Sequence, residues 1–493
     1  MITKFRHLER YPFWFDIAPL VITTAIMAVQ FFIFKDFTPH IPLIIGICIT
    51  GLFMGLKGQH WADMEHQMFN VMKVGLPAVL ILMCVGMLIS IWIAAGTVPT
   101  IVNAGLSVLT PGIFLPATCI LACLVSLATG TSWGTVGTVG LAMMGIGDAM
   151  GVPLYWTAGA VVSGSFFGDK MSPLSDTTNL TPAVTGITIW EHIRGMLPCT
   201  VPALIVSLAV YAYVGMGYAG NAAGTTSTAT IQNAMQGNFQ LGWITLIPAL
   251  AVIYMGYRKY SAMGTICLGV ALGALIAVFV QDVPLKDIFN ILQNGYKSTT
   301  GISTVDTLLS KGGVMSMTWV VTLTMFSLAF VGALETYGTF DAILGKLENI
   351  IKSRLSLVGA SYGSVLGVSL ILGEVYTSIV LPGRLLQNKY KELGYERTTL
   401  ARTIEDCGTL ASPLIPWNMG GGFVTATLGV PTVLYAPFAI FCWLSPLFGI
   451  LYALTGWYVP KTTPVSKAEL LLQKQAESLI SGYRNMLKIT SLA

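Results

Sequence analysis

Three long tracts of this chain contain no Asp, Glu, Lys or Arg: Val74–Gly147, Gly195–Tyr257 and Cys407–Pro460. A membrane-spanning helix needs roughly 20 apolar residues, so each tract holds more than one crossing. Only 10% of the 493 residues are charged, whereas soluble domains carry about 25%. A backbone in lipid must satisfy its own hydrogen bonds. The sequence therefore predicts an all-α polytopic membrane protein.

The remaining composition excludes several functions. The net charge is +4 without a Lys/Arg cluster, which gives no sign of nucleic-acid binding. No phosphate-binding loop of the ATPase type is present, and no two of the five histidines have metal-ligand spacing. We expect loop or interface roles for the histidines, and no cofactor. The eight cysteines form no CxxC pair and lie in or beside apolar segments, so they are predicted to be buried reduced thiols.

We interpret residues 1–493 as one integral membrane domain of about eleven to thirteen hydrophobic segments, several of them too short or too rich in Gly and Pro for a plain crossing. The first repeat covers about 13–217, an uncharged external linker 218–240, and the second repeat 241–457. The basic residues before 13 suggest a cytoplasmic lead-in. Apolar residues at helical spacing predict a cytoplasmic amphipathic helix over 466–490. The expected segments are 13–34, 41–56, 74–94, 112–129, 131–147, 152–167, 196–217, 241–257, 261–280, 314–335, 356–381, 408–428 and 432–457.

Basic residues lie on both sides of segment 356–381, in the loops that hold Lys352 and Arg384. Short loops rich in Lys and Arg favour the cytoplasm. A segment whose two ends both face the cytoplasm enters and leaves on the same side, so this segment is predicted to be re-entrant.

Two polar strings interrupt the apolar chain, Gly168–Asn179 and, 240 residues later, Gly408–Asn418. Both contain Ser-Pro-Leu. Proline breaks a helix and frees backbone carbonyls, which at membrane depth must line protein or a water-filled cavity. Paired breaks in matching halves of one chain are the best sequence indication of a transporter's binding site.

Two further blocks match in the same order. Gly130–Thr135 corresponds to Gly373–Ser378 at an offset of 243, and Ala160–Asp169 to Leu400–Thr409 at an offset of 240. Together with the paired breaks, these matches predict two structurally related repeats with broken helices.

The first break carries the candidate cation site. Carboxylate, hydroxyl and carbonyl oxygens are the ligands that hard cations prefer, and charged side chains at membrane depth mark a site by default. The alternative for Asp169 is an ion pair with Lys170 in a solvated loop. The predicted ligands here are Asp169, Ser172, Asp176, Thr177 and Asn179.

The second half supplies further candidates. Glu405 and Asp406 are adjacent, and two neighbouring carboxylates in a desolvated site cannot both ionise at low cost, so one suits exchange of H⁺ for a metal ion. The alternative is an ion pair with Arg402. Asp176, Asp169, Glu405 and Asp406 are the candidate Na⁺ ligands among the acids. The other candidates are Glu374, the hydroxyls of Thr131 and Ser132 as ligands or helix caps, and Ser412 and Asn418.

The strings at 130–137, 163–180 and 402–418 resemble the bacterial NhaC family of Na⁺/H⁺ antiporters, and the apolar pattern extends this resemblance over nearly the whole chain. The resemblance implies a multi-pass antiporter of the cytoplasmic membrane, in a superfamily with inverted repeats and paired re-entrant hairpins. Some members of the family resemble malate/lactate exchangers. Met419 departs from the small or hydroxyl residue expected there, which puts a side-chain ligand at this position in doubt.

We therefore expect a secondary antiporter, not an enzyme, in which Na⁺ and H⁺ compete for carboxylates at the paired breaks. The alternative within transport is a Na⁺/H⁺-coupled exchanger of small carboxylates. A passive channel and an intramembrane enzyme are the rival classes. The paired carboxylates disfavour a channel. The lack of a His/metal or Ser/Lys constellation disfavours an enzyme. Membrane lipid is the expected surrounding, and the sequence leaves a homodimer open.

Overall fold

Helices make up the fold throughout the part of the chain that the computed structural model describes, residues 11–34, 36, 38–219, 223–258, 260–302, 305–306 and 309–463. Within those residues there is no strand, only an isolated antiparallel bridge between Tyr395 and Lys461. The amphipathic helix expected at 466–490 lies outside the described residues, as does the lead-in at 1–10. The helices of the first half are α1 (Phe13–Ala28), η2 (Val29–Ile33), α2 (His40–Leu56), α3 (Trp61–Ala94), α4 (Thr97–Val108), α5 (Pro111–Thr129), α6 (Ser132–Thr135), η3 (Val136–Gly140), α7 (Leu141–Ala149), α8 (Leu154–Met171), α9 (Asp176–Thr185) and α10 (Ile189–Met216).

The chain continues through a second set of helices that ends close to the last described residues. They are α11 (Ala223–Asn238), η4 (Trp243–Leu246), α12 (Ile247–Tyr257), α13 (Ala262–Phe279), α14 (Leu285–Asn294), η5 (Val314–Met317), α16 (Thr318–Tyr337), α17 (Thr339–Ile350), α18 (Arg354–Leu372), α19 (Val375–Glu392), α20 (Arg397–Gly408), η6 (Ser412–Leu414), α21 (Met419–Leu428), α22 (Thr432–Tyr435), η7 (Ala436–Phe438) and α23 (Ile440–Thr455).

The described residues include six helices that are long and apolar enough to cross a membrane, or up to eight if each of two sharply bent pairs counts as one span. The bent pairs turn by 93° near residues 239–242 and by 91° near residues 429–431. Large apolar side chains such as Leu52, Ile205 and Leu451 are exposed, as expected for surfaces that face lipid. The predicted all-α polytopic class is confirmed.

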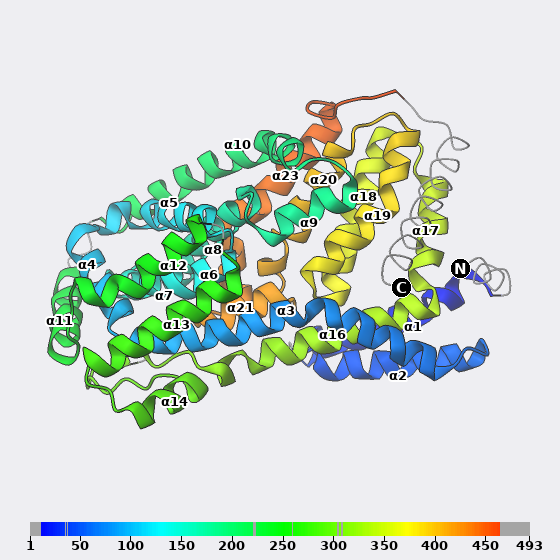
Figure 1. Ribbon diagram of the computed structural model, residues 1–493. Helices are drawn as coiled ribbons and strands as arrows, with labels where there is room; N and C mark the ends of the chain where they lie inside the picture. The colour runs from blue at the N-terminus through cyan, green and yellow to red at the C-terminus, as the bar shows by residue number, and fades with distance from the viewer. Residues whose placement is uncertain are drawn as a thin grey trace, which may run out of the picture.

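Two helical hairpins approach the middle of the molecule from opposite ends (Figure 1). The first comprises α5 and the α6–η3–α7 stretch, and lies towards the end that holds α4 and α11. The second, α18 and α19, lies towards the end that holds α17 and the described N-terminal helix. Arg354 at the start of α18 donates to the carbonyls of Ala453 and Leu454, which fixes the open end of the second hairpin beside the end of α23.

The tips of the two hairpins have the same backbone geometry. α5 ends at Gly130 with φ 71°, and α18 ends at Gly373 with φ 65°. This left-handed conformation favours glycine, because a Cβ would collide with the backbone. The next residue then caps the outgoing helix: Thr131 accepts from the Gly134 N–H, and Glu374 from two N–H groups of α19.

Two broken helices cross between the hairpin tips. α8 and α9 are separated by Ser172–Ser175, and α20 and α21 by residues 409–418. Each break packs on one tip, because a side chain at Gly130 would lie 2.6 Å from Leu174 and one at Gly373 would lie 2.7 Å from the Trp417 carbonyl. The predicted polar interruptions therefore fall between consecutive helices.

Several predicted segments are divided differently. Segment 356–381 is two helices that turn at Gly373–Glu374, while Pro382 lies within α19. The uncharged linker expected at 218–240 contains the helix α11. Gly373 ends a helix, whereas Gly363 and Gly367 lie within α18.

Candidate functional site

Asp169 lies in the last turn of α8 and is 4% exposed. Its Oδ2 accepts a hydrogen bond of 2.6 Å from Ser132, which follows the tip of the first hairpin. Its Oδ1 is buried and has no hydrogen-bond partner. The alternative of a solvated ion pair with Lys170 is wrong, because the two side chains have different partners. The unpartnered oxygen of this buried carboxylate can bind a proton or a cation.

Lys170 forms a fully buried ion pair with Asp406 of α20. Its Nζ also donates to Ser445 of α23, whose hydroxyl donates in turn to Asp406. This pair joins the first broken helix to the second. The expected alternative partner of the acids, Arg402, instead donates to the Tyr458 carbonyl, so that pairing is wrong. The sequence showed Lys170 beside Asp169 but gave no sign of its distant partner.

Glu405 is fully buried, and each of its carboxylate oxygens accepts a hydrogen bond from a threonine. The donors are Thr181 of α9 at 2.6 Å and Thr409 at 2.7 Å. The Nε2 of His192 lies 3.7 Å from Glu405 Oε2, and neither ring nitrogen of His192 has a hydrogen-bond partner. The expected loop or interface role of this histidine is therefore wrong: it is buried at the start of α10 against a candidate acid.

Asp176 begins α9 and is exposed, unlike the other acids of the site. One oxygen accepts from the Thr177 N–H at 2.8 Å and the other from the Tyr376 hydroxyl at 2.5 Å. Tyr376 lies in the first turn of α19, so this hydrogen bond ties the first break to the second hairpin. The hydroxyl of Thr177 bonds with that of Ser175 at 3.1 Å.

Glu374 and Thr131 hold equivalent positions after the two tip glycines. Glu374 is 1% exposed, and its two oxygens accept from the backbone N–H groups of Tyr376 and Thr377 at 2.9 and 2.6 Å. Carboxylates are favourable at helix N-termini, which explains how α19 begins with a buried acid. The predicted cap role of Thr131 is confirmed.

The second break is held by neutral hydrogen bonds. The Ser412 hydroxyl donates to Asn418 Oδ1 at 2.6 Å, and the Asn418 amide donates to the carbonyl and hydroxyl of Ser369. Asn418 caps α21 as Ser175 caps α9, so these two residues correspond. At the offset of 240 residues between the two breaks, Asn418 would lie opposite Thr178, so the second break has three extra residues before its helix cap.

Two predicted ligands of the first break bind the local backbone. Ser172 donates to the Leu127 carbonyl, which fastens the break to α5. The amide of Asn179 is exposed and donates to the carbonyls of Pro173 and Ser175. The Pro173 carbonyl that the break frees is therefore satisfied by a side chain six residues later.

Basic side chains cover the outer ends of the two half-helices. Arg397 donates to the Thr185 carbonyl at the end of α9, and Lys311 to the Leu428 carbonyl at the end of α21. A cation at a helix C-terminus offsets the negative end of the helix dipole. The positive ends of α9 and α21 remain at the breaks in the interior.

The structure brings Asp169, Asp176 and Glu405 close enough for mutual electrostatic repulsion. Lys170 is paired with Asp406 and the ring of His192 lies 3.7 Å from Glu405, and bound protons or cations would lower the remaining repulsion. Within the described residues, no three His, Cys, Asp or Glu side chains form a metal-binding group. Oxygen ligands for Na⁺ would therefore come from carboxylates together with hydroxyls and carbonyls.

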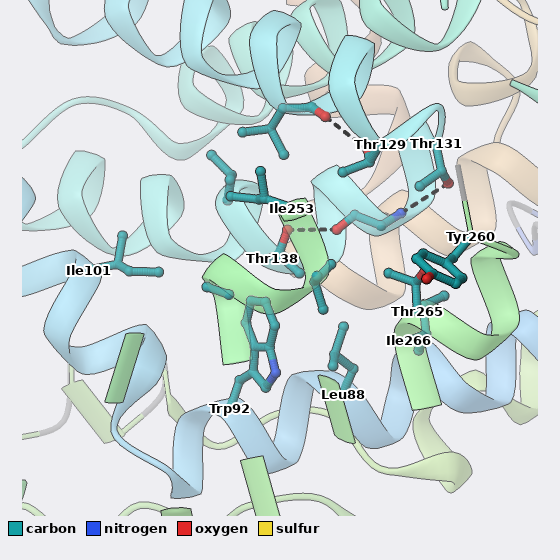
Figure 2. A pocket seen from close by; sticks show the side chains of 15 residues that line it. Leu88, Trp92, Ile101, Thr129, Thr131, Thr138, Ile253, Tyr260, Thr265 and Ile266 are labelled. Atoms are coloured by element: carbon teal, nitrogen blue, oxygen red, sulfur yellow. Dashed lines mark hydrogen bonds between the residues drawn. The ribbon is translucent and has the colours of Figure 1, made fainter. Parts of the chain in front are cut away.

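A small cavity of about 90 Å³ adjoins the first hairpin tip. Figure 2 shows the hydroxyls of Thr131 and Thr138 on the hairpin side and Trp92 and Leu88 of α3 opposite them. None of the 15 residues that line it carries a charge. The cavity is thus a largely apolar space one residue away from the Ser132–Asp169 hydrogen bond.

Broken helices whose ends meet around buried acids are the arrangement of secondary transporters. Residues 164–457 match the model of the Na⁺/H⁺ antiporter family. The chain belongs to this family and is a multi-pass membrane protein.

Curated relatives match over most of their length. The chain is 38% identical to the Na⁺/H⁺ antiporter NhaC of Alkalihalophilus pseudofirmus, with 91% of this chain and 96% of the relative covered. It is 36% identical to the arginine/ornithine antiporter ArcD of Halobacterium salinarum, with 87% and 90% covered. It is 34% identical to the malate-2H⁺/Na⁺-lactate antiporter of Bacillus subtilis, with 94% and 99% covered. These relatives are antiporters, which agrees with the expectation of a transporter.

Proposed function

We propose that this protein is a secondary active antiporter that exchanges Na⁺ for H⁺ across the bacterial cytoplasmic membrane. The observation that carries the proposal is Asp169, a buried carboxylate with one unpartnered oxygen directly before the first helix break. Burial of such a group is costly unless it binds a proton or a cation. Family membership and the relatives named as Na⁺/H⁺ antiporters support the same reading.

The proposed mechanism is competition between Na⁺ and H⁺ for the same carboxylates. Asp176 is exposed and meets the incoming ion first, and Asp169 forms the interior ligand. Repulsion between Asp169, Asp176 and Glu405 favours binding of positive charge, whether one Na⁺ or a proton. Because the two ions relieve the same repulsion, binding of one displaces the other, and this displacement couples the two fluxes.

The hydroxyls around the acids complete the proposed coordination. Ser132 and Thr177 lie next to Asp169 and Asp176. Thr181 and Thr409 already donate to Glu405, and a donating hydroxyl stabilises the ionised carboxylate. The Lys170–Asp406 pair holds the two broken helices together while the neighbouring acids exchange ions.

The test is a proteoliposome assay in which an imposed pH gradient is discharged by added Na⁺. We expect exchange by the native protein and its loss in Asp176→Asn, which keeps the shape of the side chain but not its charge. Asp282→Asn is the matched control, because Asp282 is exposed and its φ of 54° is one that Asn tolerates. Undiminished exchange in Asp176→Asn would remove Asp176 from the site.

A Na⁺/H⁺-coupled exchanger of small organic acids is the second candidate. The relative named as a malate-2H⁺/Na⁺-lactate antiporter favours it, whereas the cavity beside the first hairpin tip does not. That cavity has hydroxyls but no cation to bind a carboxylate. Uptake of radiolabelled malate or lactate, with and without a Na⁺ gradient, separates the candidates: gradient-driven uptake supports organic-acid exchange, and Na⁺/H⁺ exchange without uptake supports the first proposal.

A further inference from the structure

A recess of about 330 Å³ lies between α10, α20 and the segment after α23, away from the proposed ion site. Its wall includes two arginines, Arg194 of α10 and Arg402 of α20, and no carboxylate. The first turn of α20 contributes Thr398 and Thr399, so the positive end of that helix lies beside the recess. The lining is therefore built for negative charge.

Arg402 is the strongest indication of an absent ligand. It is 3% exposed, and no carboxylate forms an ion pair with it in the described part of the chain. Its Nη1 donates to the Tyr458 carbonyl, and its Nε has no hydrogen-bond partner. The Thr399 hydroxyl is likewise buried and without a partner. A buried guanidinium without a counter-ion is costly, and an anion in the recess would remove that cost.

The neighbouring acids do not supply this charge. Glu396, which precedes α20, accepts from the Thr398 hydroxyl at 3.2 Å but does not line the recess. Asp406 lies one turn further along α20 and is paired with Lys170. Arg194 is exposed on α10, so it can reach a ligand at the mouth of the recess.

The surroundings of the recess indicate the membrane surface. Trp190, Trp457 and Tyr458 are 61%, 68% and 59% exposed, and Tyr458 itself lines the recess. Exposed Trp and Tyr side chains gather at the level of lipid headgroups. Leu197 and Val201, further along α10, are exposed apolar residues that suit contact with acyl chains.

We propose that this recess binds the phosphate group of an anionic phospholipid, with Arg402 as the interior ligand and Arg194 at the mouth. The planar guanidinium group matches phosphate oxygens. The bound lipid would join α10 to α20, the helix that carries Glu405 and Asp406. This binding is independent of which ion the protein transports.

The test is native mass spectrometry of the purified full-length protein, titrated with phosphatidylglycerol or with phosphatidylcholine. We expect preferential binding of phosphatidylglycerol and a loss of affinity of about fivefold in Arg194→Gln, since one arginine near an anionic surface contributes that much. Arg258→Gln, which changes an exposed arginine outside the recess, is the matched control and should bind as the native protein does. Arg402→Lys keeps the interior charge but loses the planar set of N–H donors of the guanidinium group. This variant should bind phosphatidylglycerol more weakly than the native protein does.

Three results would overturn the proposal. The first is equal binding of the two lipids, and the second is an equal loss of lipid affinity in Arg194→Gln and Arg258→Gln. The third comes from a separate measurement of thermal unfolding: full protection by inorganic phosphate, without any preference for the anionic lipid. The last would assign the recess to a soluble phosphate compound. Because Arg194 is exposed, its variant is expected to fold even if a change at Arg402 prevents folding.

Discussion

The two helix breaks share a backbone design but differ in chemistry. Each break packs on a left-handed glycine at a hairpin tip, and each outgoing half-helix is capped by a polar side chain, Ser175 or Asn418. The first break has Asp169 before it and Asp176 after it, whereas hydrogen bonds among Ser412, Asn418 and Ser369 hold the second. The difference indicates that similar backbone geometry makes the two interruptions, and that the first break is flanked by carboxylates where neutral side chains hold the second.

The contacts of the two hairpins across the centre repeat this asymmetry. Trp133 of the first hairpin stacks on Phe423 of α21, with ring centroids 5.2 Å apart. Tyr376, which is 243 residues after Trp133, instead donates its hydroxyl to Asp176 of α9. One crossing is apolar packing, and the other is a hydrogen bond to a charged candidate ligand. The relation of the two halves as inverted repeats stays a prediction.

The largest expected effect comes from removing the charge of Asp169. Asp169→Asn should reduce Na⁺-driven proton flux to that of protein-free liposomes, because an amide neither releases a proton nor neutralises Na⁺. Thr409, 240 residues later, is the matching position in the second half. Thr409→Val should retain measurable flux. Equal losses in the two variants would break the proposed difference between the halves.

The next effect concerns the ion pair between the broken helices. Lys170→Met leaves Asp406 buried without its partner, and breaking such a pair costs about 3–5 kcal/mol of stability. Lys170→Met/Asp406→Asn should recover most of that loss. Chemical unfolding in detergent measures both. If the double variant is as unstable as the single one, the lysine stabilises the fold through packing and not through charge.

A smaller effect, on the affinity for Na⁺, is expected from the aromatic residues that link each hairpin to a half-helix. Tyr376→Phe removes the hydroxyl that binds Asp176, and a hydrogen bond to a charged group corresponds to about a tenfold change in apparent Na⁺ affinity. Trp133→Phe keeps an aromatic ring on Phe423 and should change that affinity little. Measuring flux against Na⁺ concentration distinguishes the two. If Trp133→Phe changed the Na⁺ affinity more than Tyr376→Phe does, the contact of Trp133 would matter more for ion binding than the hydrogen bond of Tyr376.

The sequence predicted the interruptions well, because Pro173, Pro413 and the tip glycines act locally on the backbone. Partners across the fold could not be predicted in the same way. Lys170 and Asp406 are 236 residues apart, and nothing in the local pattern of either residue marks the pairing. A loop or interface role was expected for His192 because no second histidine lies at metal-ligand spacing from it, yet its ring lies against Glu405, far away in the sequence. The length of the second break also hid the match of Asn418 with Ser175.

The smallest expected effect tests whether the two tips need different caps. Thr131→Ala removes the hydroxyl that accepts from Gly134, and losing such a cap costs about 1 kcal/mol. Thr131→Ser keeps the hydroxyl and should restore stability in the same unfolding measurement. Glu374 makes two such hydrogen bonds as a buried carboxylate, so Glu374→Ala should destabilise the protein more. If Thr131→Ala costs as much as Glu374→Ala, the charge of Glu374 adds nothing to its cap, and its burial requires a function in ion binding.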